Sequence, residues 1–168
     1  MIVRLTRQEL AECRQAATAR WQLARASGVN NQRRDSNKTD NDIDFLGICG
    51  EVATAKALSI DYSPRAIGVD DGMDMWAAGM SIDVKATFHE NGRLLFKSIN
   101  SFAADIAILV TPTQEEGCFN VVGGISRLAF GKNHVAKDLG HGEGVMVDQD
   151  QLCPLKDIWE YITARRVG

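Results

Sequence analysis

The segment Ser81–Phe88 alternates apolar residues with charged or polar ones. Within it, Asp83 and Lys85 are separated by Val84, so a strand would project both charged side chains from the same face. A carboxylate beside an ammonium group, close to further oxygen ligands, can help to hold a divalent cation and stabilise negative charge. We therefore take this pair as the centre of a candidate catalytic site.

A hairpin would bring a second carboxylate to this strand. If Ala78 and Gly79 form a two-residue loop, Asp74 lies directly opposite Asp83, with the two Cβ atoms roughly 5 Å apart. Like charges at this separation repel each other, and Mg²⁺, which proteins hold with one or two carboxylates plus water, would offset the repulsion. The rival candidates for this upstream ligand are Asp70 and Asp71.

A third carboxylate lies within the mostly apolar helix that the sequence predicts over residues 44–58. Glu51 is surrounded there by alanine and branched residues, and an unpaired carboxylate is costly to bury. Its spacing leaves two interpretations open: a site carboxylate, or an exposed side chain on a polar face near Lys56. Gly47 and Gly50 in the same helix indicate a close approach to a strand.

The order of these residues, with Glu51 on a helix, Asp74 on a strand and Asp83-x-Lys85 on the next strand, resembles the signature of the PD-(D/E)XK nuclease superfamily. The resemblance covers about residues 45–125, and methionine precedes Asp74 where the motif has proline. It implies a restriction-endonuclease-like core that hydrolyses phosphodiester bonds, most readily in DNA, with Mg²⁺ as cofactor and Mn²⁺ as a substitute. Compact phage and mobile-element nucleases have this general size and look.

The expected roles follow from this resemblance and from the chemistry of phosphodiester hydrolysis. Asp74 and Asp83 would ligate the ion together with the carbonyl oxygen of Val84, and Glu51 would complete a second metal position or hold a metal-bound water. Lys85 would orient or deprotonate the attacking water and stabilise negative charge on the phosphate. The residues also allow a plainer interpretation, in which the pair belongs to an exposed strand face with alternating charges.

Basic residues are concentrated before residue 39, although the net charge of −3 argues against a protein that coats nucleic acid by bulk electrostatics. Thr6 and Glu9 form a capping box, which predicts a helix that begins there and ends near Gly28. The polar residues 28–41 that follow predict a mobile loop. This region fits a phosphate-binding arm or, equally, a solvated helix face with a connector. The side chains expected to contact nucleic acid, two of them further along the chain, are Arg25, Arg33, Arg34, Lys38, Thr87 and Lys97.

The rest of the chain alternates apolar runs with turn residues. The Asn91-Gly92 pair predicts that residues 93–99 fold back as a third strand against the one that carries Asp83. The other expected elements are a buried strand at 105–110, a strand at 118–122, a short helix at 126–130, a loop at 131–144 with His134 and His141, an edge strand at 145–147 and a helix from Pro154 onward.

This order predicts an α/β (α+β) fold in which helices flank a mixed central sheet of about five strands. A length of 168 residues with 45% hydrophobic and 24% charged residues fits one globular domain over residues 1–168, with the basic helix and polar loop at 1–44. No run is long and apolar enough to span a bilayer, so we expect a cytoplasmic protein without a membrane partner. The four scattered cysteines predict reduced thiols.

Two other functions remain open at this point. The fold of this superfamily also serves catalytically inactive modules that bind nucleic acid or a protein partner. A Holliday-junction resolvase is a further alternative, and it would require a homodimer with two sites facing one junction.

Overall fold

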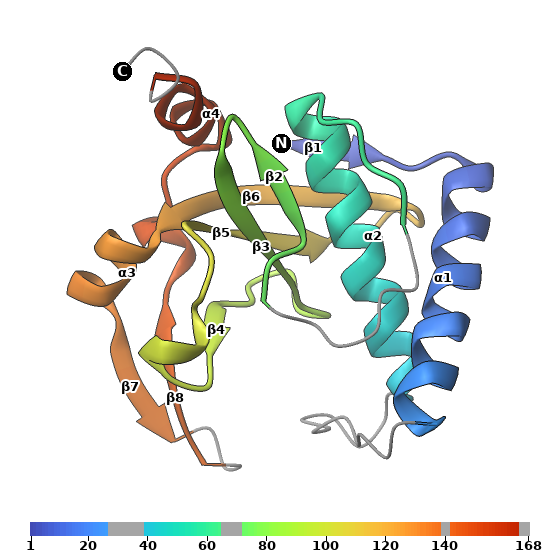
Figure 1. Ribbon diagram of the computed structural model, residues 1–168, viewed down its shortest axis with the longest axis horizontal. Helices are drawn as coiled ribbons and strands as arrows, with labels where there is room; N and C mark the ends of the chain where they lie inside the picture. Colours follow the sequence, from blue (N-terminus) through green and yellow to red (C-terminus); the bar gives the residue numbers. More distant parts are fainter. Residues whose placement is uncertain (27–38, 65–71, 139–141, 165–168) are drawn as a thin grey trace.

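The computed structural model describes residues 1–26, 39–64, 72–138 and 142–164. Its elements confirm the α/β (α+β) class. Five strands form a mixed sheet in the order β1-β6-β5-β3-β2, and three more form a smaller sheet in the order β4-β8-β7 (Figure 1). The α-helices and strands are β1 (Ile2–Arg4), α1 (Arg7–Ala26), α2 (Asp40–Leu58), β2 (Met75–Ala77), β3 (Met80–Ala86), β4 (Leu94–Phe96), β5 (Ile106–Pro112), β6 (Cys118–Ser126), α3 (Arg127–Asn133), β7 (Val135–Asp138), β8 (Glu143–Val147) and α4 (Leu155–Ala164).

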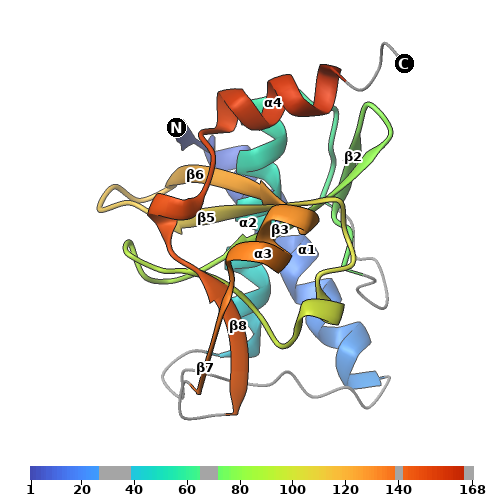
Figure 2. The ribbon, with the colours of Figure 1, turned by 90° about the vertical axis from the view of Figure 1, so that its left-hand side faces the viewer.

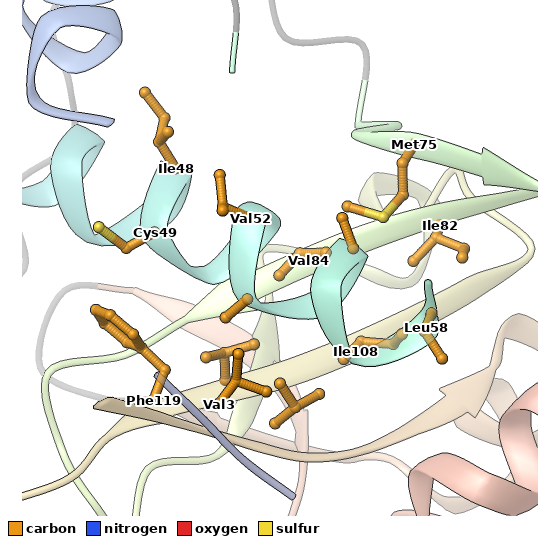
Figure 3. Packing of buried hydrophobic residues seen from close by; sticks show 14 of the residues in the cluster. Val3, Ile48, Cys49, Val52, Leu58, Met75, Ile82, Val84, Ile108 and Phe119 are labelled. Atoms are coloured by element: carbon orange, nitrogen blue, oxygen red, sulfur yellow. The ribbon is translucent and has the colours of Figure 1, made fainter. Parts of the chain in front are cut away.

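Helix α2 packs against one face of the five-stranded sheet and, together with α1 and α4, closes the larger hydrophobic core. Figure 3 shows Val84 and Ile108 of the central strands beneath α2, with Leu58 near Ile108 and Ile48 pointing away from the sheet. Branched side chains at every second strand position supply this core, because alternate residues of a strand point to the same face. The strands β3 and β5 run parallel, whereas the other paired strands of this sheet are antiparallel.

The opposite face of the sheet is covered by the smaller sheet and α3. Phe96, Phe102 and Phe130 meet there, with the first two rings stacked at a centroid distance of 4.5 Å. Figure 1 shows α1 and α2 on one side of the molecule and α3, β7 and β8 on the other, and Figure 2 shows α4 lying beside β6. The second core therefore lies on the face of the five-stranded sheet that is opposite α2.

Both long helices begin at capping boxes. The predicted one at the start of α1 is confirmed, since Thr6 Oγ1 accepts from the Glu9 amide at 3.1 Å. The predicted start of the second helix near residue 44 is wrong, because Thr39 and Asp42 form a further capping box and α2 begins at Asp40. The loop prediction for residues 28–41 therefore fails at its C-terminal end, while residues 27–38 lie outside the described part.

The predicted third strand against β3 is also wrong. A turn does form, but one residue earlier than predicted: the Gly92 amide donates to the His89 carbonyl at 2.9 Å, and neither Asn91 nor Gly92 has the positive φ of a type I′ turn. However, β5 pairs along one edge of β3, and β2 together with the Asp74 carboxylate occupies the other edge as far as Val84. Strand β4 pairs instead with β8 in the smaller sheet.

The predicted buried strand and the terminal helix are confirmed as β5 and α4, but three short strands differ from expectation. Strand β7 occupies part of the predicted loop at 131–144. All four of its residues are exposed, so its sequence has no buried apolar alternation that would have predicted a strand. The predicted edge strand at 145–147 is β8, the middle strand of the smaller sheet. Strand β1 was not predicted, since three residues are too few to show a period.

Gly50 marks a close contact between α2 and the sheet, as predicted. A Cβ atom added there would lie 3.1 Å from the Ala86 Cβ atom. The same prediction for Gly47 is wrong, because nothing lies within 4 Å of its added Cβ position. The four cysteines are free thiols, as expected.

Candidate functional site

Strand β3 sends its side chains alternately to the two cores. Ile82 and Val84 pack with α2 in the larger core. Asp83 is paired with Ala107 of β5, a residue of the second core, and therefore projects from the opposite face. Lys85 shares that face, so the prediction that the acid and the lysine lie side by side is confirmed.

The Asp83 carboxylate and the Lys85 ammonium form an ion pair of 2.6 Å. Asp83 is only 1% exposed, whereas the side chain of Lys85 is 34% exposed. The Lys85 Nζ atom also lies 5.4 Å from the centre of the Phe96 ring. The lysine thus compensates a buried negative charge and still reaches solvent, which excludes the interpretation of the pair as a fully exposed strand face.

Asp74 lies at the edge of β3 just beyond the end of β2. The predicted two-residue hairpin is confirmed, since Ala77 pairs with Met80. The Asp74 amide donates to the Ile82 carbonyl at 2.9 Å, and Asp74 Oδ2 accepts from the Val84 amide at 2.6 Å. The Asp74 carboxylate therefore takes the place that a longer β2 would have filled.

The same edge carries the backbone oxygen that the sequence analysis proposed as a metal ligand. The N–H and C=O groups of one strand residue point to the same side of the strand. Because the Val84 N–H points to Asp74, the Val84 carbonyl oxygen is directed to the same edge. Two of the proposed oxygen ligands thus share one side of β3.

The pKa of Asp74 is raised to about 8. Burial is the largest cause, and the negative charges of Glu51 and Asp83 add to it, while the Val84 N–H and the Lys85 ammonium act in the opposite direction. All four proposed catalytic side chains therefore influence one another through Asp74. Because the neighbouring negative charges add to the effect of burial, a cation at this position would be favoured.

Glu51 is buried on α2, with 3% of its surface exposed, which excludes its interpretation as a solvated side chain. Arg20 of α1 lies 3.3 Å from its Oε1 atom, and the Tyr62 hydroxyl donates to its Oε2 atom. Burial and the Glu51 charge raise the pKa of Tyr62. Burial opposes the charge on Arg20, yet the Glu51 carboxylate outweighs it and raises the pKa of the guanidinium.

Sequence reasoning missed both partners of Glu51. Arg20 follows Ala17 by three residues and precedes Ala24 by four, so it lies on the same face of α1 as these apolar residues. A basic residue on such a stripe must find an anion when the helix packs, and this signal could have identified it. Tyr62 follows α2 in an irregular segment and carries no comparable signal.

The donor set fits a hard cation that is held by few protein ligands. Mg²⁺ is usually bound by one or two carboxylates plus water and substrate oxygens, which matches Asp74, Asp83 and the Val84 carbonyl. Among the residues that the structure describes, no group of three or more His, Cys, Asp or Glu side chains is arranged to hold a metal ion. Glu51, engaged by Arg20 and Tyr62, is consequently better suited to hold a water than to act as a third direct ligand.

The residues expected to contact nucleic acid are less closely grouped. Arg25 is exposed, and its guanidinium lies over the Trp21 ring at 4.4 Å. Thr87 follows β3 directly, and its amide donates to the Val110 carbonyl at 3.1 Å. Lys97 is exposed beyond β4 and lines an open groove with Ile99 and other residues, none of which is a proposed catalytic residue. Arg33, Arg34, Lys38, Asp70, Asp71 and His141 lie outside the described residues.

Comparison with known proteins finds one family model, described as a family of unknown function (DUF5843), which matches residues 2–110. The matched stretch contains Glu51, Asp74, Asp83 and Lys85. Neither the curated proteins nor the solved structures contain a match. Across the described residues, no helix has both the length and the apolar character needed to cross a membrane.

Proposed function

Since the chain belongs to DUF5843, a family of unknown function, its activity must be argued from its own residues, and we propose that it is a metal-dependent nuclease acting on DNA. The observation that carries the proposal is the convergence of Glu51, Asp83 and Lys85 on Asp74. These four residues come from α2, from β3 and from the position just before β2, and each of the other three shifts the pKa of Asp74. Perturbed carboxyl groups of this kind are typical of functional sites.

The chain's own groups divide the work of hydrolysis among them. Asp74, Asp83 and the Val84 carbonyl would hold the ion, which when bound would lower the pKa of a water molecule and neutralise charge on the phosphate. Lys85 would orient the attacking water or stabilise the developing negative charge, because its ammonium group is partly exposed beside Asp83. Glu51, fixed by Arg20 and Tyr62, would accept a hydrogen bond from a site water.

The decisive experiment is incubation with single-stranded, duplex, branched and RNA substrates in Mg²⁺, Mn²⁺ or EDTA. We expect cleavage in either metal, none in EDTA, and none by an Asp83→Asn variant. Glu116→Gln is the matched control, since Glu116 is exposed in the turn between β5 and β6. Retained cleavage by Asp83→Asn, or cleavage in EDTA, would remove this site from the reaction.

One observation favours the catalytically inactive alternative. The Lys85 ammonium forms an ion pair with Asp83 and the Arg20 guanidinium forms one with Glu51. In a catalytically inactive domain such pairs would balance the buried charges without a metal ion. Calorimetric titration with Mn²⁺ separates the two functions, because a nuclease site should bind the ion through Asp74 and Asp83. Binding of equal strength by wild type and Asp83→Asn would favour the interaction module.

The Holliday-junction resolvase requires two sites in one assembly. Sedimentation analysis of the protein tests for the homodimer, and the branched substrate above tests for the activity. A monomer that cleaves linear DNA as well as junctions would exclude this alternative.

The salt dependence of DNA affinity tests whether the basic N-terminal region contacts phosphates. Each phosphate contact that is lost reduces the slope of log affinity against log salt concentration by about 0.7 to 0.9. We expect Arg33→Gln with Arg34→Gln to weaken DNA binding and flatten this dependence. An unchanged slope would show that these arginines do not contact phosphate.

A further inference from the structure

Trp76 is exposed although its two neighbours in β2 are buried. Its relative exposure is 59%, against 5% for Met75 and 7% for Ala77. Met75 and Ala77 belong to the core beneath α2, so Trp76 points to the other side of the strand. A single exposed apolar residue is common on protein surfaces, and its position decides whether it has a use.

The position of Trp76 is next to the proposed catalytic carboxylates. Trp76 pairs with Ser81 in the β2–β3 hairpin, and Asp83 is two residues beyond Ser81. Trp76 and Asp83 are therefore diagonal neighbours on one face, a relationship that places residues roughly 7–8 Å apart and within reach of an aromatic side chain. Asp74 precedes Trp76 by two residues, so Trp76 lies close to both carboxylate-bearing residues within the hairpin.

No strand of the described part pairs with the outer edge of β2, which ends the sheet order. Figure 2 shows β2 at the margin of the molecule, away from α3 and β7. A ligand that approaches from this margin would contact the Trp76 indole close to Asp74 and Asp83. An aromatic face binds a flat ring, and the only part of a nucleic acid that offers one is a base free of its own stack.

We propose that Trp76 is a stacking platform for an unpaired nucleobase beside the scissile phosphate, so that the site takes single-stranded DNA in preference to intact duplex. This inference rests on the proposed nuclease function and adds the substrate class. A paired base within a duplex cannot reach the indole without unstacking, which is unfavourable.

The test measures binding of a labelled single-stranded oligodeoxynucleotide and of the matching duplex in EDTA, followed by cleavage of both in Mg²⁺. Stacking contributes about 1–3 kcal/mol per base, so Trp76→Ala should weaken single-strand binding by about 5- to 150-fold. It should leave duplex binding unchanged. Trp76→Phe should bind the single strand almost as wild type does, because it keeps an aromatic ring.

A spectroscopic readout identifies the contact directly. The single strand should quench part of the tryptophan emission of the wild type, and Trp76→Phe should lose that quenching while Trp21 and Trp159 continue to emit. Leu128→Ala is the control for loss of an exposed apolar side chain, since Leu128 is 72% exposed on α3. It should bind the single strand as wild type does.

Two results would overturn the inference and leave the nuclease function standing. One is metal-dependent cleavage with unchanged single-strand affinity in Trp76→Ala, and the other is an equal loss of affinity for single strand and duplex. A wild-type protein that neither binds nor cleaves any of the substrates would instead refute the nuclease function, and the stacking role with it.

Discussion

The backbone N–H of Val84 donates to Oδ2 of Asp74 at 2.6 Å, across the edge of β3 that β2 leaves open. This bond places a carboxylate in the plane of the sheet, between Glu51 on the α2 side and Asp83 on the opposite side. The position explains why burial and two neighbouring carboxylates together keep Asp74 from ionising at its ordinary pKa.

The raised pKa of Asp74 predicts that stability falls as the pH rises. Between the ordinary value of 3.8 and about 8, the folded protein holds a proton that the unfolded chain has released, so the free energy of unfolding decreases with pH across this window. Asp74→Asn cannot ionise and should show a smaller decrease. Urea denaturation in EDTA at several pH values measures both slopes, and equal slopes would contradict the prediction.

Removing the Lys85 ammonium alone should destabilise the fold more than removing the charges of Lys85 and Asp83 together. Lys85→Met removes the cation that lies 2.6 Å from the buried Asp83 carboxylate, and since Lys85 is about a third exposed, solvent screening limits the expected loss to about 1–2 kcal/mol. Adding Asp83→Asn to this variant should restore part of the stability. Urea denaturation of the two single variants and the double variant checks this.

The exposed Lys156, which belongs to α4, provides the control for this cycle. Lys156→Met should change stability by less than about 0.5 kcal/mol. If the double variant lost more unfolding free energy than the two single variants lose when their losses are added, the ion pair would not be the source of the effect.

Two glycines of α2 should respond in opposite directions to alanine. Gly50→Ala places a methyl group 3.1 Å from the Ala86 Cβ atom, and we expect the overpacking cost of about 1–3 kcal/mol to exceed the gain of up to about 1 kcal/mol in helix propensity. Gly47→Ala meets nothing within 4 Å and should stabilise the helix by up to about 1 kcal/mol. Denaturant midpoints of both variants measure the difference, and a shift of the same sign in each would refute the packing argument.

The hairpin that positions Asp74 turns through an alanine in a left-handed conformation. Ala78 has φ 47° and Gly79 has φ +83°, the pattern of a type I′ turn, in which asparagine is preferred at the first position. Ala78→Asn should therefore stabilise the protein by about 0.5–1 kcal/mol. Thermal unfolding measures the gain, and Ala77→Asn, at a buried strand position, should instead be destabilising.

Local pattern was enough to predict the hairpin register, the pairing of Asp83 with Lys85 and the mixed sheet. The first two depend on residues close in sequence, where strand alternation and a two-residue turn leave few arrangements, whereas the mixed sheet followed from the order of the predicted helices and strands. The same reasoning failed for residues 93–99, because the turn at Gly92 could be recognised locally but the occupation of both edges of β3 could not. The start of α2 was mistaken although Thr39 and Asp42 carried a local signal.

By itself, the amino-acid sequence determined which charged residues share a strand face, because side-chain direction along a strand depends only on spacing. The tertiary structure alone decided that Arg20 and Tyr62 engage Glu51, and that Asp74 occupies the open edge of β3. These contacts join α1, α2 and β3 through packing of whole elements, and the burial that packing creates is what raises the pKa of Asp74.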